Sequence, residues 1–200
     1  MKKDNALLIF TRNLVFGKVK TRLAATIGHK KAFVVYKLLI DHTFSATRFL
    51  PADKYVFYSD YKEAGDVWTE DYFRAAQSGK DLGKRMSNAF NYIFRQGYKK
   101  AVIIGADCPD LDETVIQNAF DNLDHYDVVI GPALDGGYYL LGMKSQHSQL
   151  FENMAWSTET VFRETIARCE QLQLTYFLLP VLNDVDEEKD LINTSLIKNA

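Results

Sequence analysis

Residues 101–111 read AVIIGADCPDL, and this stretch decides the fold. Its apolar, β-branched run ends at Gly105, and Pro109 cannot extend a strand because it has no N–H donor. The run predicts a strand buried on both faces, with Asp107 at its carboxyl end. Ligands of open α/β sheets bind at that edge, so Asp107 is placed to hold a metal ion or a polar substrate group.

Similar runs recur along the chain between helical patterns. We expect strands at residues 6–10, 55–58, 72–76, 101–104, 127–130, 138–141 and 175–179. Helical spacing of apolar residues predicts helices at residues 30–49, 82–95, 112–122 and 158–171, and a short terminal helix within residues 191–200. Asp112 and Thr158 are expected N-caps. This alternation predicts an α/β fold with helices on both faces of a sheet.

The bulk composition limits the classes of function. The 200 residues fit one domain, and 24 basic against 26 acidic residues give a net charge of −2. That balance favours neither nucleic acid nor an anionic membrane as a partner. Two cysteines are too few for a disulfide framework, and the first apolar run is too short for a signal sequence or membrane span. A cytoplasmic location is expected, and the sequence carries no feature that specifies an oligomeric state.

The loop after the first predicted strand carries a basic cluster. Four cations surround Gly17, namely Arg12, Lys18, Lys20 and Arg22. A glycine lets the backbone approach a phosphate closely, and Lys and Arg side chains neutralise it. The position of the loop favours phosphate binding over the alternative, a solvated basic loop.

Carboxylates form the second constellation. Magnesium is commonly held by one protein carboxylate together with phosphate oxygens and water, and Asp107 is the candidate ligand. Asp110 and Asp112 are more simply read as turn and N-cap residues. Near the end of the chain, Asp184 and Asp186 alternate, so on an extended segment both could face one side and join a metal site.

Residues 131–142, GPALDGGYYLLG, form the third constellation. Gly136 and Gly137 permit backbone geometry that a side chain would block, and Asp135 lies in the same turn. A substrate pocket and an ordinary Asp-Gly hairpin turn are equally favoured readings. Tyr138 and Tyr139 should point to opposite faces of the next strand, so at most one is expected beside the pocket of Asp135.

Two weaker signals remain. Residues 77–86, QSGKDLGKRM, place Lys84 and Arg85 at the start of a helix, which could meet an anion or could simply be a capped surface helix. Trp156 could line a pocket or pack beneath the following helix.

Taken together, the motifs resemble a known family. FxxxxxxGKVKTRLA, QxxxDLGxRM, IGADCPDL, GPALDGGYYLLG, WST and LxDVDEEKDL occur in the order found in a bacterial family of GT-A-like glycosyltransferases linked to arsenosugar biosynthesis, formerly a domain of unknown function. The resemblance covers residues 6–191 and implies the nucleotide-diphospho-sugar transferase superfamily: a Rossmann-like α/β/α sandwich with a mostly parallel mixed sheet. With the chain length, this predicts a single domain over residues 1–200.

The resemblance also implies roles for individual residues. Phosphates would lie near Gly17, Lys18, Lys20 and Arg22. Mg²⁺ or Mn²⁺ would lie at Asp107, with Asp186 as a possible further ligand, and Asp135, Gly136 and Gly137 would border the acceptor or sugar pocket.

The residues themselves add further candidates to those that the resemblance implies. Arg12, Lys84 and Arg85 are expected nucleotide-binding residues, and Tyr138 and Trp156 are expected in the substrate pocket. Asp107 and Asp135 are the catalytic candidates.

Three hypotheses follow for the function. The leading one is a metal-dependent transferase that moves a glycosyl group from a nucleotide-sugar to a small acceptor. The second is a nucleotidyltransferase that joins a nucleoside monophosphate from a triphosphate to a phosphorylated small molecule. The third is a non-catalytic nucleotide-binding module that works through a partner protein.

Overall fold

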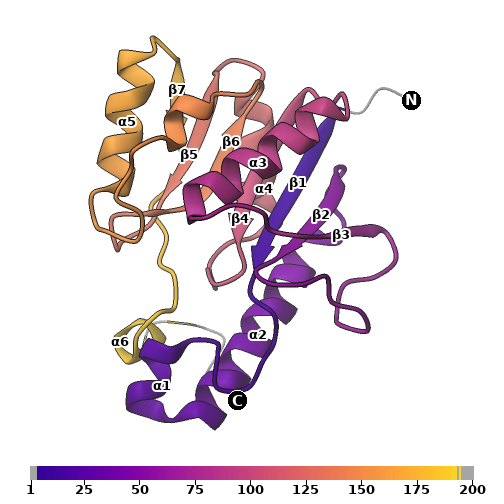
Figure 1. Ribbon diagram of the computed structural model, residues 1–200, viewed down its shortest axis with the longest axis vertical. Coiled ribbons are helices and arrows are strands. Elements are labelled where there is room, and N and C mark those ends of the chain that lie inside the picture. Colours follow the sequence, from indigo (N-terminus) through magenta and orange to yellow (C-terminus); the bar gives the residue numbers. More distant parts are fainter. Residues whose placement is uncertain (1–3, 193, 195–200) are drawn as a thin grey trace.

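A computed structural model describes residues 4–192 and residue 194, which form a seven-stranded sheet with helices on both faces (Figure 1). The strands are β1 (Asn5–Thr11), β2 (Asp53–Tyr58), β3 (Tyr72–Ala76), β4 (Lys100–Gly105), β5 (Val128–Pro132), β6 (Tyr138–Met143) and β7 (Tyr176–Leu178). Their order across the sheet is β3-β2-β1-β4-β6-β5-β7. Only β6 runs antiparallel to its neighbours β4 and β5, so the sheet is mixed and mostly parallel, as predicted.

The helices form the two outer layers. They are α1 (Thr21–Ile27), α2 (His29–Thr47), α3 (Leu82–Arg95), α4 (Glu113–Asn122), α5 (Val161–Gln171), α6 (Glu188–Leu191) and the 3₁₀ helix η1 (Ser148–Phe151). Leu39 of α2 and Phe120 of α4 pack on one face of the sheet. Phe90 of α3 and Cys169 of α5 pack on the other. Both faces of the central strands are therefore buried, which explains why β1 and β4 read as continuous apolar runs.

Most predicted elements are confirmed, with differences at helix starts. The Asp112 side chain accepts from the N–H of Val115 at 2.8 Å, so its N-cap role is confirmed. The N-cap role of Thr158 is wrong: its hydroxyl donates to the carbonyl of Ala155, and α5 begins three residues later at Val161. Helix α1 was not predicted, because its seven residues are too few to display a clear period.

The described chain ends with a short helix. The terminal helix predicted within residues 191–200 lies largely outside the described residues, in which α6 ends at Leu191. No helix in the described ranges has the length and apolar character needed to cross a bilayer. The single-domain organisation over residues 1–200 stays a prediction.

The strand register brings the chemistry-bearing segments together. Phe10 of β1 lies opposite Gly105 of β4 in a parallel pair, so the chain leaves both strands at the same edge of the sheet. The basic loop after β1 and the Asp107 segment after β4 are therefore neighbours. Since β6 is antiparallel, it begins at this edge, which adds the Asp135 turn to the same place.

Candidate functional site

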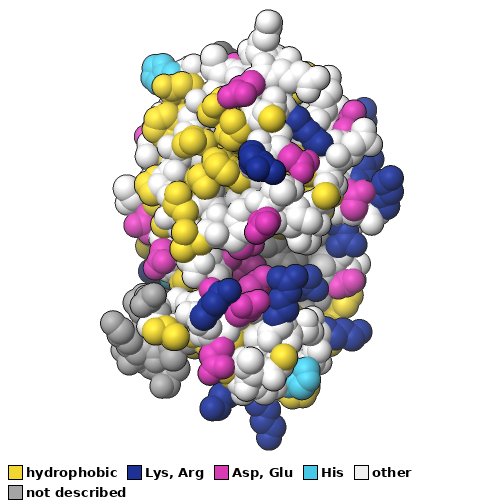
Figure 2. Space-filling model, turned by 90° about the vertical axis from the view of Figure 1, so that its left-hand side faces the viewer, with side chains coloured by type: hydrophobic (Ala, Val, Ile, Leu, Met, Phe, Trp, Pro, Cys, Tyr) yellow, Lys and Arg dark blue, Asp and Glu magenta, His cyan; other side chains and the backbone are white. Residues whose placement is uncertain are grey.

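A pocket of about 970 Å³ lies at this edge of the sheet. Figure 2 shows it as a hollow in the middle of the molecule, with acidic side chains gathered inside and basic ones beside them. Its walls come from the first loop, the start of α3, the segment after β4, the β5–β6 turn, the loop before α5 and the segment before α6. The carboxyl edge predicted to bind ligands is thus the edge that is hollowed.

Two carboxylates inside the pocket share one ammonium group. Lys20 Nζ lies 3.0 Å from Asp107 Oδ2 and 2.9 Å from Asp186 Oδ1. Its side chain is only 6% exposed, which is rare for a lysine and requires such partners. Burial opposes the charged form, but attraction to both carboxylates outweighs it and raises the pKa of Lys20. Lys20 is therefore held as a cation between Asp107 and Asp186.

Local backbone features place Asp107. A Cβ added at Gly105 would lie 2.6 Å from Asp107 Oδ1, so a larger residue at the end of β4 would push this carboxylate out of its present position. The N–H of Val185 donates to the backbone carbonyl of Asp107 at 3.0 Å. This bond anchors the segment that carries Asp184 and Asp186 beside the end of β4.

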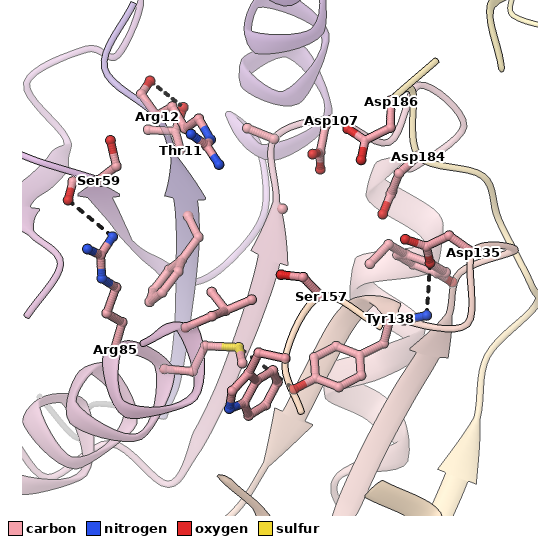
Figure 3. Close-up of a pocket in the computed structure, with 18 of the residues that line it drawn as sticks. Thr11, Arg12, Ser59, Arg85, Asp107, Asp135, Tyr138, Ser157, Asp184 and Asp186 are labelled. Atoms are coloured by element: carbon pink, nitrogen blue, oxygen red, sulfur yellow. Dashed lines mark hydrogen bonds between the residues drawn. The ribbon is translucent and has the colours of Figure 1, made fainter. Parts of the chain in front are cut away.

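Asp184 is the most unusual carboxylate of the pocket. Its Oδ1 atom is buried and has no hydrogen-bond partner among the described residues. Burial and the charge of Asp107 raise the pKa of Asp184 well above its usual range, although the Lys20 charge works in the opposite direction. Figure 3 shows Asp184 lying between Asp186 and Asp135 and pointing into the pocket. Asp107 and Asp186 therefore share one buried ammonium, and Asp184 adds a third acid whose charged form the site disfavours.

The opposite wall of the pocket is cationic and polar. Arg85 donates from Nε to the carbonyl of Gly79 at 3.2 Å and from Nη1 to the carbonyl of Ser59 at 3.4 Å. The backbone N–H of Arg12 donates to the hydroxyl of Tyr36 at 2.8 Å, which fixes the start of the first loop. Asp107, Asp184 and Asp186 lie across the pocket from Arg12 and Arg85, as Figure 3 shows.

The third wall is the turn between β5 and β6 with the loop before α5. Asp135 is exposed, and its Oδ1 accepts from the N–H of Gly137 at 2.8 Å, so the carboxylate both shapes the turn and faces the pocket. Gly136 has φ +87°, and a Cβ there would lie 2.2 Å from the carbonyl oxygen of Glu159. The turn is therefore packed directly against the loop that carries Glu159.

Trp156 both lines the pocket and packs. A Cβ at Gly83 would lie 2.3 Å from its indole ring, so the ring rests on the backbone at the start of α3. Tyr138 and Tyr139 also both line the pocket, which contradicts the expectation that at most one would. They do lie on opposite faces of the sheet, but the pocket spans the end of the sheet and so reaches both.

The pocket brings together most of the predicted site residues. These are Arg12, Lys18, Lys20, Arg22, Arg85, Asp107, Asp135, Gly137, Tyr138, Trp156 and Asp186. Gly17 and Lys84 are not among the residues that line it, and Lys84 is exposed one position before Arg85 on α3. Gly136 lines a smaller adjoining cavity of about 350 Å³.

Sequence reasoning missed several residues of the pocket. Tyr36, Ser59 and Glu159 line it, and they belong to none of the motifs recognised in the sequence. The alternation of Asp184 and Asp186 predicted that both could face one site, and both line the pocket.

The acidic residues of the pocket can be compared with the ligands that a divalent cation requires. Among the described residues, no group of three or more His, Cys, Asp or Glu side chains is arranged as a ready metal site. However, one ammonium contacts both Asp107 and Asp186, so a single cation can bridge them, and the buried Oδ1 of Asp184 lacks a partner within the part of the chain that the structure describes. Oxygen ligands of this kind fit Mg²⁺ or Mn²⁺.

The sheet order and the pocket define the class of protein: the fold is that of the nucleotide-diphospho-sugar transferases and related nucleotidyltransferases. The predicted superfamily is thereby confirmed. The chain belongs to the family described as "Uncharacterized protein conserved in bacteria (DUF2064)", which matches residues 43–158. No curated protein sequence matches the chain.

Solved structures support this assignment. A crystal structure from Desulfovibrio desulfuricans G20, named a putative nucleotide-diphospho-sugar transferase, is 34% identical with a TM-score of 0.87, and the match covers 96% of this chain and 85% of that one. Rv0371c from Mycobacterium tuberculosis H37Rv, solved in complex with manganese, is 11% identical with a TM-score of 0.56 and coverage of 96% and 97%. The inositol-1-phosphate CTP transferase from T. maritima is 11% identical with a TM-score of 0.53 and coverage of 96% and 93%. At such low identity the last two are similar in fold alone.

Proposed function

We propose that this protein is a metal-assisted transferase that binds a nucleotide-sugar and moves its glycosyl group to a small acceptor with a neutral hydroxyl. The observation that carries the proposal is the division of charge in one pocket. A cationic wall with Arg12 and Arg85 faces the carboxylates at the end of β4, and a second acidic wall with Asp135 adjoins them. The name of the 34% identical relative supports the same class of reaction.

The cationic wall is suited to the diphosphate of the donor. Arg12, Lys18, Arg22 and Arg85 all border the pocket. Arginine presents a planar fork of donors that matches phosphate oxygens, and the exposed Lys18 adds a mobile charge. These residues would bind the donor and hold its leaving diphosphate.

The central carboxylates are suited to a divalent cation. Asp107 would hold it, with Asp186 and the unpartnered Oδ1 of Asp184 as further oxygen ligands. Such an ion would neutralise the charge that develops on the departing diphosphate. The manganese complex of a protein with the same fold supports this choice of metal.

The acceptor wall favours glycosyl over nucleotidyl transfer. Asp135 and Glu159 both line the pocket there, and a phosphorylated acceptor would be repelled by two carboxylates. A neutral hydroxyl can instead donate a hydrogen bond to Asp135, which could take its proton as a general base in the transfer step. Nucleotidyl transfer, the activity in the name of the T. maritima protein, is therefore the second candidate.

Product analysis tests the proposal. The purified protein is incubated with Mn²⁺ and either a panel of nucleotide-sugars or a panel of nucleoside triphosphates, each with candidate acceptors. We expect release of nucleoside diphosphate from a nucleotide-sugar. Release of pyrophosphate from a triphosphate would instead establish nucleotidyl transfer. Nucleotide binding without turnover in any arm would favour a non-catalytic binding module.

A further inference from the structure

The Lys20 side chain contacts carboxylates, although its position in the basic loop predicts a contact with phosphate. It lies in a basic loop predicted to bind phosphate, yet its side chain is 6% exposed and its Nζ contacts Asp107 and Asp186. In contrast, Arg22, two residues away, is 67% exposed and lies 3.6 Å from Asp186. Of these two cations, only Lys20 occupies the centre of the carboxylate cluster.

The backbone at Lys20 is adapted to this placement. Lys20 has φ 46° and ψ 49°, a left-handed conformation that residues other than glycine seldom adopt. It is the N-cap of α1, where an ammonium, which only donates, cannot cap the free N–H groups. Strained conformations persist where surrounding contacts hold them, and they cluster at functional sites. The two ion pairs of Lys20 are contacts of this kind.

A single ammonium leaves the cluster unsatisfied. Lys20 contacts two of the three carboxylates, while Oδ1 of Asp184 is buried with no partner in the described ranges. A divalent cation carries twice the charge of an ammonium and prefers oxygen ligands, so between Asp107 and Asp186 it would neutralise more of the charge of the cluster than Lys20 does. A metal ion and the Lys20 ammonium compete for the same oxygens of Asp107 and Asp186.

We infer that Lys20 is an exchangeable internal cation: it holds the carboxylate cluster in the metal-free protein, and metal binding displaces it toward the phosphates of the donor. The inference rests on the proposed function in one respect, the metal at Asp107. Its consequence is coupling between the two ligands. Metal alone must break two ion pairs to bind, whereas metal with a nucleotide diphosphate offers the released ammonium new partners, so each ligand should strengthen binding of the other.

Calorimetry of Mn²⁺ binding tests the exchange without any catalytic readout. We compare the wild-type protein with Lys20→Met and with Arg22→Met, which removes the same charge from the exposed partner of Asp186. Without nucleotide, Lys20→Met should bind Mn²⁺ about tenfold or more tightly, the scale of one charge-assisted hydrogen bond. Arg22→Met should change the affinity much less. With a nucleoside diphosphate present, the strengthening of Mn²⁺ binding should be smaller in Lys20→Met than in the wild type.

Selective labelling provides a second readout that needs no variant at position 20. Brief acetylation followed by mass spectrometry should modify Lys20 more when Mn²⁺ is added, because the side chain leaves its buried position. Lys18, which is already exposed, should not change and serves as the internal control. Adding a nucleoside diphosphate with Mn²⁺ should protect Lys20 again.

The outcomes separate this inference from the proposed function. Two results would overturn the exchange while leaving the metal site in place. One is wild-type Mn²⁺ binding that is as tight as in Lys20→Met or tighter. The other is acetylation of Lys20 that does not change when Mn²⁺ is added. Absence of Mn²⁺ binding in every variant would overturn the exchange and the metal together. Failure to transfer any glycosyl group, with both Mn²⁺ responses as expected, would remove the proposed reaction but keep the exchange.

Discussion

Replacement of the buried carboxylate at Asp184 should stabilise the metal-free protein at neutral pH. Burial and the charge of Asp107 raise the pKa of Asp184 in the folded state. In the unfolded chain an aspartate has a pKa of about 3.9. Ionisation at neutral pH is therefore harder in the folded protein, so Asp184 costs stability there. Asp184→Asn removes this cost and keeps the shape of the side chain.

The sign of the pH dependence follows from the raised pKa. Below the unfolded pKa, Asp184 is protonated in both states and contributes no electrostatic penalty. As the pH rises above about 4, the unfolded chain loses its proton first, so the folded state is increasingly penalised until it also ionises. The advantage of Asp184→Asn should therefore grow as the pH rises through this window and then become constant.

The magnitude follows from the charge that Asp184→Asn removes, because the amide keeps the polar atom at the position of Oδ1. Each unit by which the folded-state pKa of Asp184 exceeds its unfolded value costs about 1.4 kcal/mol at a pH above both values. For a chain of this length, 1 kcal/mol corresponds to roughly 2–4 °C in Tm. Asp184→Asn should therefore unfold several degrees higher at pH 7 in the presence of a chelator.

Urea unfolding between pH 4 and pH 8, with EDTA present, measures this effect. Asp110→Asn is the matched control, because Asp110 is exposed in the turn after β4 and should show little change. The metal should reduce this advantage: at 100 times its Kd, Mn²⁺ should stabilise the wild type by about 2.7 kcal/mol and Asp184→Asn by less. A mutant that is no more stable than wild type at pH 7, or whose advantage is independent of pH, would refute the reasoning.

Three further predictions concern the walls of the pocket. Asp135→Asn keeps the acceptor oxygen for the Gly137 N–H but removes basicity, so turnover should fall by roughly 10²-fold while nucleotide affinity, measured by calorimetry, stays close to wild type. Arg85→Ala should weaken binding of a nucleoside diphosphate by about tenfold or more, whereas Lys84→Ala, one residue away on the exposed side, should leave it within about twofold; equal losses would exclude a specific role for Arg85. Gly83→Ala places a Cβ against the indole of Trp156, so it should destabilise by about 1–3 kcal/mol instead of gaining helix propensity, and a red-shifted tryptophan emission would report the displaced ring.

Local patterns in the sequence predicted the α/β class and most of its strands and helices. The apolar run before Gly105 predicted β4, and Asp107 was placed correctly at its carboxyl end, because strand burial and strand termination are written into neighbouring residues. Asp112 was recognised as an N-cap for the same reason: its bond to Val115 spans three residues. The N-cap prediction for Thr158 was wrong because the loop continues to Thr160, which is the N-cap position of α5. Ser157 adopts a left-handed conformation in this loop, and the sequence does not indicate that conformation.

The sequence by itself determined which segments are strands and helices and which carry carboxylates or cations, because these properties repeat over a few residues. Only the tertiary structure decided what each charged side chain contacts. Lys20 lies 87 residues from Asp107 and 166 from Asp186, and its pairing arises where separate segments converge at one edge of the sheet. The burial of Asp184 has the same origin, since a carboxylate loses water only when elements distant in the chain close around it.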